Sequence, residues 1–200
     1  MARTRAADYD ERREAIVEKA AELFADKGFE GASISGLAAA CNTSKSLIYH
    51  YYTSKEELLY AVMSSHIDDL LDAVNNLAIA QGKPAERMSA LIHEFLGIYV
   101  GAAARQKVLL NDLRSLPDDR RSEIVLKQRS VISAMDRLLA GVQPALAKDK
   151  HRLRAATMLV FGMINWTSNW YRPKGPVSPD ELATLATALI LDGTNGYKDP

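Results

Sequence analysis

The chain has 200 residues, 25 basic and 25 acidic side chains, and therefore a formal net charge of zero. This balance excludes a protein coated in positive charge, so any contact with nucleic acid has to come from a local patch. Apolar residues make up 48% of the chain, which excludes a disordered polypeptide. The single cysteine, Cys41, excludes an internal disulfide and fits a reducing compartment.

The apolar segments are too short for a membrane span. The longest run, "AATMLVFGMINW", falls well below the roughly 20 residues that a transmembrane helix needs. The opening "MARTRAADYDERRE" also lacks the apolar core of a secretory signal. We expect a soluble cytoplasmic protein without a membrane partner.

The first predicted elements are one long helix followed by two short ones. Apolar residues recur at helical spacing from Tyr9 to Lys27, and Gly28 is a favourable stop. Ser33 is a predicted N-cap for the segment "ISGLAAA", and Ser44 for "KSLIYHYY". Asn42 lies between them and tolerates the left-handed backbone that a tight turn requires. This order predicts a helix-turn-helix.

The rest of the chain is also predicted to be helical. Capping boxes at Ser54/Glu57 and Ser178/Glu181 open the first and last of these helices. The predicted segments run from Lys55 to about Ala80, from Pro84 through Tyr99, around Val108, from after "SLPDD" to about Val142, from about Lys150 to Tyr171, and onward from Pro179. No apolar alternation with the period of a strand stands out, so the predicted fold class is all-α.

The helix-turn-helix lies in a window without carboxylates. Between Glu30 and Glu56 there is no acidic residue, while Lys45 and Lys55 are present, so a phosphate backbone can approach. Hydroxyls, ammonium groups and rings in this window suit phosphates and base edges. The predicted DNA-binding residues are Ser33, Ser44, Lys45, Leu47, Tyr49, His50, Tyr51 and Lys55. Arg3 and Arg5 of the arm "MARTR" are further candidates, and Leu37, Ile48 and Tyr52 are predicted core.

The segment "ASISGLAAACNTSKSLIYHYYTSKEELL" resembles the DNA-binding module of the tetracycline repressor (TetR) family. The likeness depends on Ser44-Lys45, on Tyr49-His50-Tyr51 and on the run "SKEEL", which fall in the family's register. The chain departs from the family pattern at Gly36 (usually acidic), Asn42 (usually Gly) and Leu47 (usually Thr). Leu47 has no hydroxyl, so its expected contact with DNA is apolar.

The resemblance implies an Ω-shaped homodimer with about nine helices in each subunit and an N-terminal three-helix module. It also implies that the last two helices pair with those of the partner subunit. The apolar helix around Met158 and the stripe through Leu182, Leu185 and Leu189 support this pairing, because they lack a second burial partner in one small domain. We divide the chain into a DNA-binding domain, 1–55, and an effector-binding and dimerisation domain, 56–200. We expect a ligand-responsive repressor of palindromic operator DNA.

The stretch "FGMINWTSNWYRPKGPVSPDEL" resembles the C-terminal helix of TetR repressors that respond to acyl-CoA thioesters. The resemblance implies an acyl-CoA effector, with phenylacetyl-CoA as the best candidate, and no cofactor. An acyl or aryl tail needs an apolar slot, and the CoA part needs cations and rings. Arg129 stands in an apolar stripe, which favours a buried or ion-paired role. The predicted ligand residues are Phe95, Arg129, Phe161, Asn165, Trp166, Trp170, Tyr171 and Arg172.

Several alternatives stay open. The effector could be a fatty acyl-CoA, or a hydrophobic drug whose efflux pump the protein controls. Trp166 and Trp170 suit a dimer interface as well as a ligand. An interaction protein that has lost DNA is disfavoured by the acid-free window. An enzyme is not expected, because the four histidines (His50, His66, His93 and His151) are scattered, no metal-binding spacing exists, and Cys41 has no activating partner.

Overall fold

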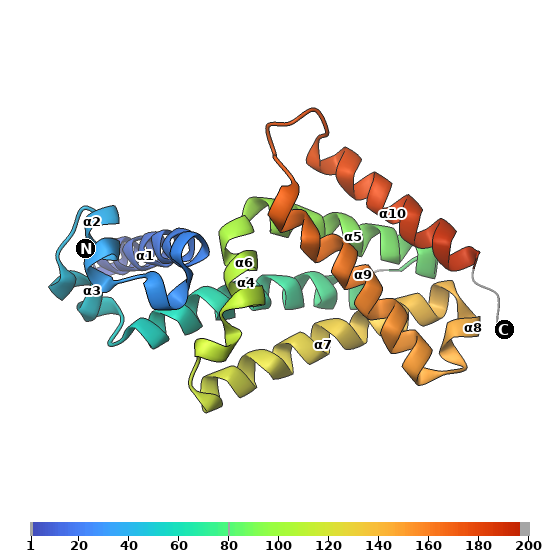
Figure 1. Ribbon diagram of the computed structural model, residues 1–200, viewed down its shortest axis with the longest axis horizontal. Helices are drawn as coiled ribbons and strands as arrows, with labels where there is room; N and C mark the ends of the chain where they lie inside the picture. The colour runs from blue at the N-terminus through green and yellow to red at the C-terminus, as the bar shows by residue number, and fades with distance from the viewer. Residues whose placement is uncertain (1, 80, 197–200) are drawn as a thin grey trace. The chain divides into compact units, whose positions relative to one another are not determined.

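The computed structural model describes residues 2–79 and 81–196, with side chains for residues 9–77, 81–194 and 196. This part of the chain contains ten α-helices, one 3-10 turn and no strand (Figure 1). The all-α prediction is confirmed. The count exceeds the expected nine by the single-turn helix α8 (Pro144–Ala147), which the sequence analysis missed.

The chain forms two compact units. The first comprises Met1–Ile67 together with Ala104–Val125, and the second comprises Asp68–Ala103 together with Leu126–Pro200. A later segment of the chain is therefore part of the unit that contains the helix-turn-helix. The helices of the first unit are α1 (Ala2–Gly31), α2 (Ile34–Ala40), α3 (Lys45–Tyr51), the start of α4 (Lys55–Ile79), α6 (Ala103–Asn111), the turn η1 (Leu113–Ser115) and the start of α7 (Asp118–Val142).

The α1 helix buries the apolar stripe that the sequence predicts. Ile16, Ala20 and Phe24 are all buried. The helical geometry breaks at Gly28, whose φ is 70° and ψ is 162°. Glycine adopts this backbone conformation without the steric cost that a Cβ adds. The predicted stop at Gly28 is thus confirmed as a break, although one more turn follows it.

The start of α4 differs in one detail from the predicted capping box. The Ser54 hydroxyl accepts a hydrogen bond from the Glu57 amide at 3.0 Å, as expected. The Glu57 carboxylate, however, accepts from the amide and the hydroxyl of Thr53, each at 2.6 Å. Thr53 offers two donors, whereas the amide of Ser54 offers one. The carboxylate therefore binds Thr53, the residue that precedes the N-cap, in place of Ser54.

The second unit contains the rest of α4 and α7, with α5 (Pro84–Gly101), α8, α9 (Lys150–Trp170) and α10 (Pro179–Asn195). The α5 helix packs against both α9 and α10, and Figure 1 shows the extended loop that joins these last two helices. At the start of α10 the predicted capping box is confirmed. The Ser178 hydroxyl accepts from the Glu181 amide at 3.2 Å, and the Glu181 carboxylate accepts from the Ser178 amide at 2.8 Å.

The α9 helix is less buried within the chain than its composition predicts. Val160, Phe161 and Ile164 are buried. Leu159 is 76% exposed and Trp166 is 64% exposed, so the expectation of burial on several faces is wrong for the single chain. Among the described residues of this unit, α5, α8 and α10 contact α9, while Met158, Leu159 and Trp166 remain exposed on it.

Candidate nucleic-acid interface

The α2 and α3 helices are positioned by serine caps and one left-handed residue. The Ser33 hydroxyl accepts from the Gly36 amide at 3.1 Å, and the Ser44 hydroxyl accepts from the Leu47 amide at 3.2 Å. Asn42 has a φ of 49° and reverses the chain between the two helices. All three features agree with the sequence prediction. Each serine uses an oxygen lone pair for its cap, so its O–H can still donate to a phosphate oxygen.

One face of α3 is locked into the core. Leu37, Ile48 and Tyr52 are buried, as predicted. The opposite face of α3 is open to solvent: Lys45 and His50 are exposed, and the Tyr49 side chain is 50% exposed. Since the core holds the helix and no carboxylate lies within it, its outer face is a fixed surface compatible with a polyanion.

Tyr51 is half-buried against α1 through a ring that the sequence analysis overlooked. The rings of Tyr9 and Tyr51 lie 4.7 Å apart between centroids, and Tyr9 meets His50 edge-on at 6.4 Å. His50 and Tyr51 are themselves 5.3 Å apart. Tyr9 therefore helps to orient two predicted DNA-binding side chains. Its only sequence signal was its place at the start of the predicted helix.

Lys55 is the predicted DNA-binding residue that the structure engages most strongly within the protein. Its ammonium donates to the carbonyl oxygens of Phe29 and Ala32 at 2.8 and 3.1 Å. It also lies 4.1 Å from the centroid of the Phe29 ring. Two of its three N–H donors are thus used inside the protein. The other predicted DNA-binding residues lie on α2 and α3 or next to them: Ser33, Ser44, Lys45, Leu47, Tyr49, His50 and Tyr51. The side chains of Arg3 and Arg5 lie outside the described residues.

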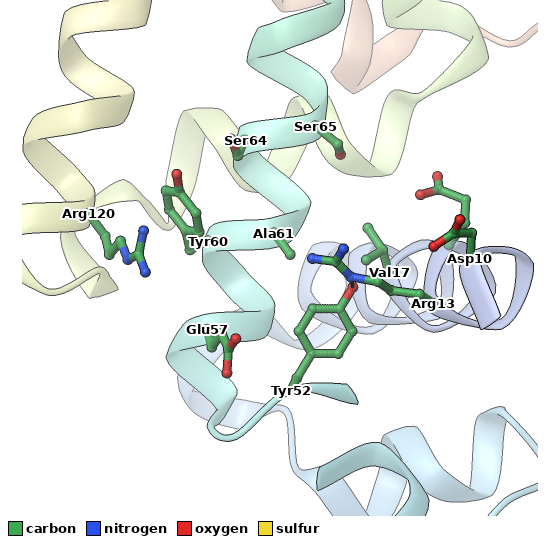
Figure 2. A pocket seen from close by; sticks show the side chains of 11 residues that line it. Asp10, Arg13, Val17, Tyr52, Glu57, Tyr60, Ala61, Ser64, Ser65 and Arg120 are labelled. Carbon is green, nitrogen blue, oxygen red and sulfur yellow. Dashed lines mark hydrogen bonds between the residues drawn. The ribbon is translucent and has the colours of Figure 1, made fainter. Parts of the chain in front are cut away.

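A polar hollow of about 510 Å³ lies behind the C-terminal end of α3 (Figure 2). In it the Nε of Arg13 on α1 donates to the Tyr52 hydroxyl at 3.2 Å. Burial raises the pKa of Tyr52, and the Arg13 hydrogen bond opposes this rise. Arg120 lies 4.4 Å from the Tyr60 ring centroid, and the hydrogen bonds from Thr53 lower the pKa of Glu57. The hydrogen bond from Arg13 to Tyr52 connects α1 to the end of α3. Because arginines and acids both line the hollow, its charge favours neither an anionic nor a cationic ligand.

A second polar cluster, which the sequence analysis also missed, ties α6 to α1 and α4. Arg105 donates to Glu18 at 3.0 Å, to the Ser65 hydroxyl at 3.1 Å and to Glu14. Beside it the Nε2 of buried His66 lies 2.6 Å from the Gln106 side-chain oxygen. Burial lowers the pKa of His66. The charge of Arg105 is therefore matched by carboxylates of α1.

The predicted ligand residues of the second unit separate into buried and exposed groups. Phe95 and Phe161 are buried, with ring centroids 6.2 Å apart. Tyr171 is buried and its hydroxyl donates to the Val177 carbonyl at 2.9 Å. Asn165 is half-buried, and Trp166, Trp170 and Arg172 are exposed.

Arg129 corrects an expectation. It is exposed on α7, so the predicted burial is wrong. Leu126, three residues earlier on the same helix, is exposed as well. The apolar neighbours of Arg129 in sequence therefore do not enclose it in space.

The described side chains show neither a metal cluster nor a membrane span. They contain no group of three or more His, Cys, Asp or Glu side chains that could hold a metal ion. Among the described helices none is long and apolar enough to cross a membrane.

The helix-turn-helix is capped by serines, and its second helix is held by the core and carries no carboxylate. These features are typical of an all-α regulator that binds DNA. Residues 16–62 match the family described as "Bacterial regulatory proteins, tetR family". Residues 81–194 match "Tetracyclin repressor-like, C-terminal domain". The chain belongs to the TetR family of bacterial transcriptional regulators.

Solved structures and curated relatives agree with this assignment. A TetR-family regulator from Bordetella parapertussis is 38% identical, with a TM-score of 0.87 over 94% of this chain and 98% of that one. The repressor KstR2 of Mycolicibacterium smegmatis is 24% identical over 186 residues, 91% of this chain and 90% of its own length. AibR, in a complex with isovaleryl coenzyme A and operator DNA, is 24% identical with a TM-score of 0.75 over 89% and 97% of the two chains.

Proposed function

We propose that this protein is a ligand-responsive repressor that binds palindromic operator DNA as a homodimer and leaves it when an acyl-CoA thioester binds. The observation that carries the proposal is the outer face of α3, which is exposed while its inner face is held by buried Ile48. A recognition helix needs this combination of a fixed position and free polar side chains. A regulator of operator DNA works in the cytoplasm, where the DNA is.

For DNA contact we propose a division of roles. The hydroxyls of Ser33 and Ser44 and the ammonium of Lys45 take phosphates, because they are exposed at the ends of α2 and α3. Leu47, Tyr49 and His50 face base edges or thymine methyls. The other two candidates, Tyr51 and Lys55, act mainly by supporting the helix, since both are engaged within the protein.

The DNA proposal is tested by selecting a duplex from a random pool and measuring its affinity by fluorescence anisotropy. Phosphate contacts weaken as salt rises from about 50 to 200 mM. Lys45→Ala lowers the slope of log affinity against log salt by about one. The matched control is Lys83→Ala, which removes an exposed lysine from the other unit. Salt-independent binding, or no selected duplex, would contradict the proposal.

The homodimer is proposed from the uncovered apolar side chains of α9 and α10. A hollow of about 790 Å³ between these helices is lined by Leu159, Met163 and Leu189, among others. Exposed apolar residues on both helices extend this surface: Met158, Leu159, Met163, Trp166, Trp170, Leu185 and Leu189. A patch of this kind favours association. A second copy of the same two helices supplies a matching surface under twofold symmetry.

The effector proposal is supported by two observations. The first is the tail "NWYRPKG", with Trp166, Trp170 and Arg172 exposed around the end of α9. The second is AibR, which has been solved with isovaleryl coenzyme A and operator DNA. Phenylacetyl-CoA is our first candidate. The buried rings of Phe95 and Phe161 offer an apolar wall to its aromatic part, with Asn165, Tyr171 and Arg129 as the remaining candidate contacts.

A thermal-shift screen tests the effector class. Phenylacetyl-CoA, several fatty acyl-CoAs, free CoA, the free acids and hydrophobic drugs are compared. A ligand at a hundred times its Kd stabilises the protein by about 2.7 kcal/mol. A thioester that exceeds both free CoA and its free acid supports the proposal. A response to fatty acyl-CoAs or to drugs alone selects one of the two alternatives, a fatty acyl-CoA sensor or a regulator of an efflux pump.

The proposed response uses α4, which begins beside the helix-turn-helix at Lys55 and continues to Ile79. We place the functional boundary where α4 starts, with 1–55 as the DNA-binding domain and 56–200 as the effector-binding domain. Ligand binding favours a state in which α4 pivots and the spacing of the two recognition helices changes. Only a difference in ligand affinity between the two states can drive this change.

A further inference from the structure

A small pocket in the second unit combines two arginines with an apolar wall. Its volume is about 240 Å³, and α4, α5 and α7 all contribute to it. The two arginines are Arg87 on α5 and Arg137 on α7. The apolar residues that line it are Val74, Leu77, Leu91, Ala134 and Leu138. Among the described residues that line this Arg87–Arg137 pocket, none is acidic.

The hydrogen-bonding capacity of these two arginines is largely unused. One terminal nitrogen of Arg87 donates to the Leu77 carbonyl at 2.9 Å. Its Nε is buried and has no hydrogen-bond partner among the described residues. A buried donor without a partner costs free energy, so native proteins normally satisfy it. A ligand atom bound in the pocket would supply the acceptor that Arg87 lacks.

Other arginines of the chain show what a structural role looks like here. Arg105 is matched by Glu14 and Glu18. Arg154 is matched by Asp136 at 2.8 Å, although Asp136 is the sequence neighbour of Arg137. Within the described residues no carboxylate pairs with Arg87 or Arg137, and the pocket therefore carries positive charge that nothing in it balances.

We propose that the Arg87–Arg137 pocket binds the anionic part of the effector, a phosphate or carboxylate attached to an apolar group. Guanidinium groups bind both anions through paired N–H donors, and the apolar wall accepts the adjoining carbon atoms. The pocket is small enough to hold the charged group and not a whole thioester. This assignment deepens the proposed function and rests on it for the identity of the ligand.

The experiment measures Kd by calorimetry for the full chain and its variants. Arg137→Glu reverses the charge of a residue that is exposed and has no partner among the described residues, so folding is not at risk. Arg87→Gln removes the buried donor. Lys150→Glu is the matched control, because it also reverses an exposed positive charge of this unit but does not line the pocket. The probes are phenylacetyl-CoA, free CoA, free phenylacetate and inorganic pyrophosphate.

The expected result is that Arg137→Glu weakens binding of the anionic probes about tenfold or more, while Lys150→Glu leaves it unchanged. If the binding of free CoA and pyrophosphate depends on Arg137, the occupant is a phosphate. If the binding of phenylacetate depends on Arg137, the occupant is a carboxylate. Equal Kd values for Arg137→Glu and Lys150→Glu with every probe that binds overturn the proposal. Wild-type protein that binds none of the probes overturns it as well.

These outcomes separate the pocket from the proposed function. If the thioester binds tightly and neither Arg87→Gln nor Arg137→Glu changes its Kd, the pocket proposal is refuted. The proposal of an acyl-CoA-responsive repressor then still stands. Phenylacetate binding that depends on Arg137, without any thioester binding, supports the pocket and refutes the acyl-CoA effector.

Discussion

The outer surfaces of α3 and of α9–α10 are both exposed in this chain, but they are exposed in opposite ways. On α3 the exposed side chains are Lys45, Tyr49 and His50, each with a polar tip. On α9 and α10 they include Leu159, Trp166 and Leu189, which are apolar or nearly so. The first surface is compatible with water and with a phosphate backbone. Exposure of the second surface to water is unfavourable, and an association that covers it lowers the free energy.

The comparison shows that exposure alone does not identify a partner. The chemistry of the exposed atoms does so, together with the rigidity of what lies beneath. Under α3 the buried Ile48 fixes the helix, and under α9 the buried Ile164 does the same. Three changes, from the largest expected effect to the smallest, test the two surfaces, and a fourth tests the buried cluster around His66.

Leu159→Glu together with Leu189→Glu should abolish the dimer. The two charges would be buried without partners in the proposed interface, which association cannot tolerate. Light scattering should show a monomer. Operator affinity should fall by about 10² to 10⁴, because one half-site is then bound without the other. The control is Thr184→Glu, an exposed position on α10 outside the apolar set. A double variant that stays dimeric would remove the basis of the dimer proposal.

Ile48→Ala should lower the free energy of unfolding by about 2–5 kcal/mol, because it leaves a cavity in the core beneath α3. Ile48 is fully buried. The measurement is urea unfolding followed by circular dichroism. Ser46→Ala on the same helix, at an exposed position, should change stability by less than about 0.5 kcal/mol. Comparable losses in both variants would mean that α3 is not held through Ile48.

Tyr49→Ala should separate binding from folding. Its side chain is half exposed, so the melting temperature should change little. Operator binding should weaken by about 1–3 kcal/mol if Tyr49 meets a base edge. Anisotropy titrations with a selected duplex measure this loss, and Tyr49→Phe keeps the ring while removing the hydroxyl. Undiminished affinity in Tyr49→Ala would exclude Tyr49 from the interface.

The smallest expected effect concerns pH and the cluster around His66. Burial lowers the folded-state pKa of His66 below its ordinary value of 6.5, so the folded state binds fewer protons than the unfolded state. This contribution to stability is complete above pH 6.5 and is lost as the pH falls below it toward the folded-state pKa. Unfolding free energies of the wild type and of His66→Gln, measured from about pH 8 to pH 5, should converge toward acid. Parallel curves would contradict this linkage.

Much of the helix-turn-helix could be predicted because its determinants are local in sequence. Ser33 and Ser44 cap amides three residues ahead, and Asn42 reverses the chain within its own turn. The apolar periods of α1, α2 and α3 select Leu37 and Ile48 as core. The candidate DNA-binding surface follows from the same periods, because its residues occupy the opposite face of α3.

The roles of the charged side chains could not be predicted in this way. Arg129 was expected to be buried and is exposed, whereas Arg105 meets carboxylates on α1, 87 and 91 positions earlier in the chain. The hydrogen bonds from Lys55 to carbonyls at the end of α1 were likewise not predicted. Long flexible side chains find their partners through space, and neither periodicity nor spacing reports on such partners.

The sequence by itself determined the all-α class, the capped turn between α2 and α3, and the acid-free window, because caps, turns and apolar periods act over a few residues. Only the tertiary structure decided which side of α9 is covered and which arginines lack a carboxylate. It also placed Ala104–Val125 in the unit of the helix-turn-helix and showed Arg87 and Arg137 lining one pocket. These features depend on how distant helices pack, since burial and ion pairing are properties of the assembled core.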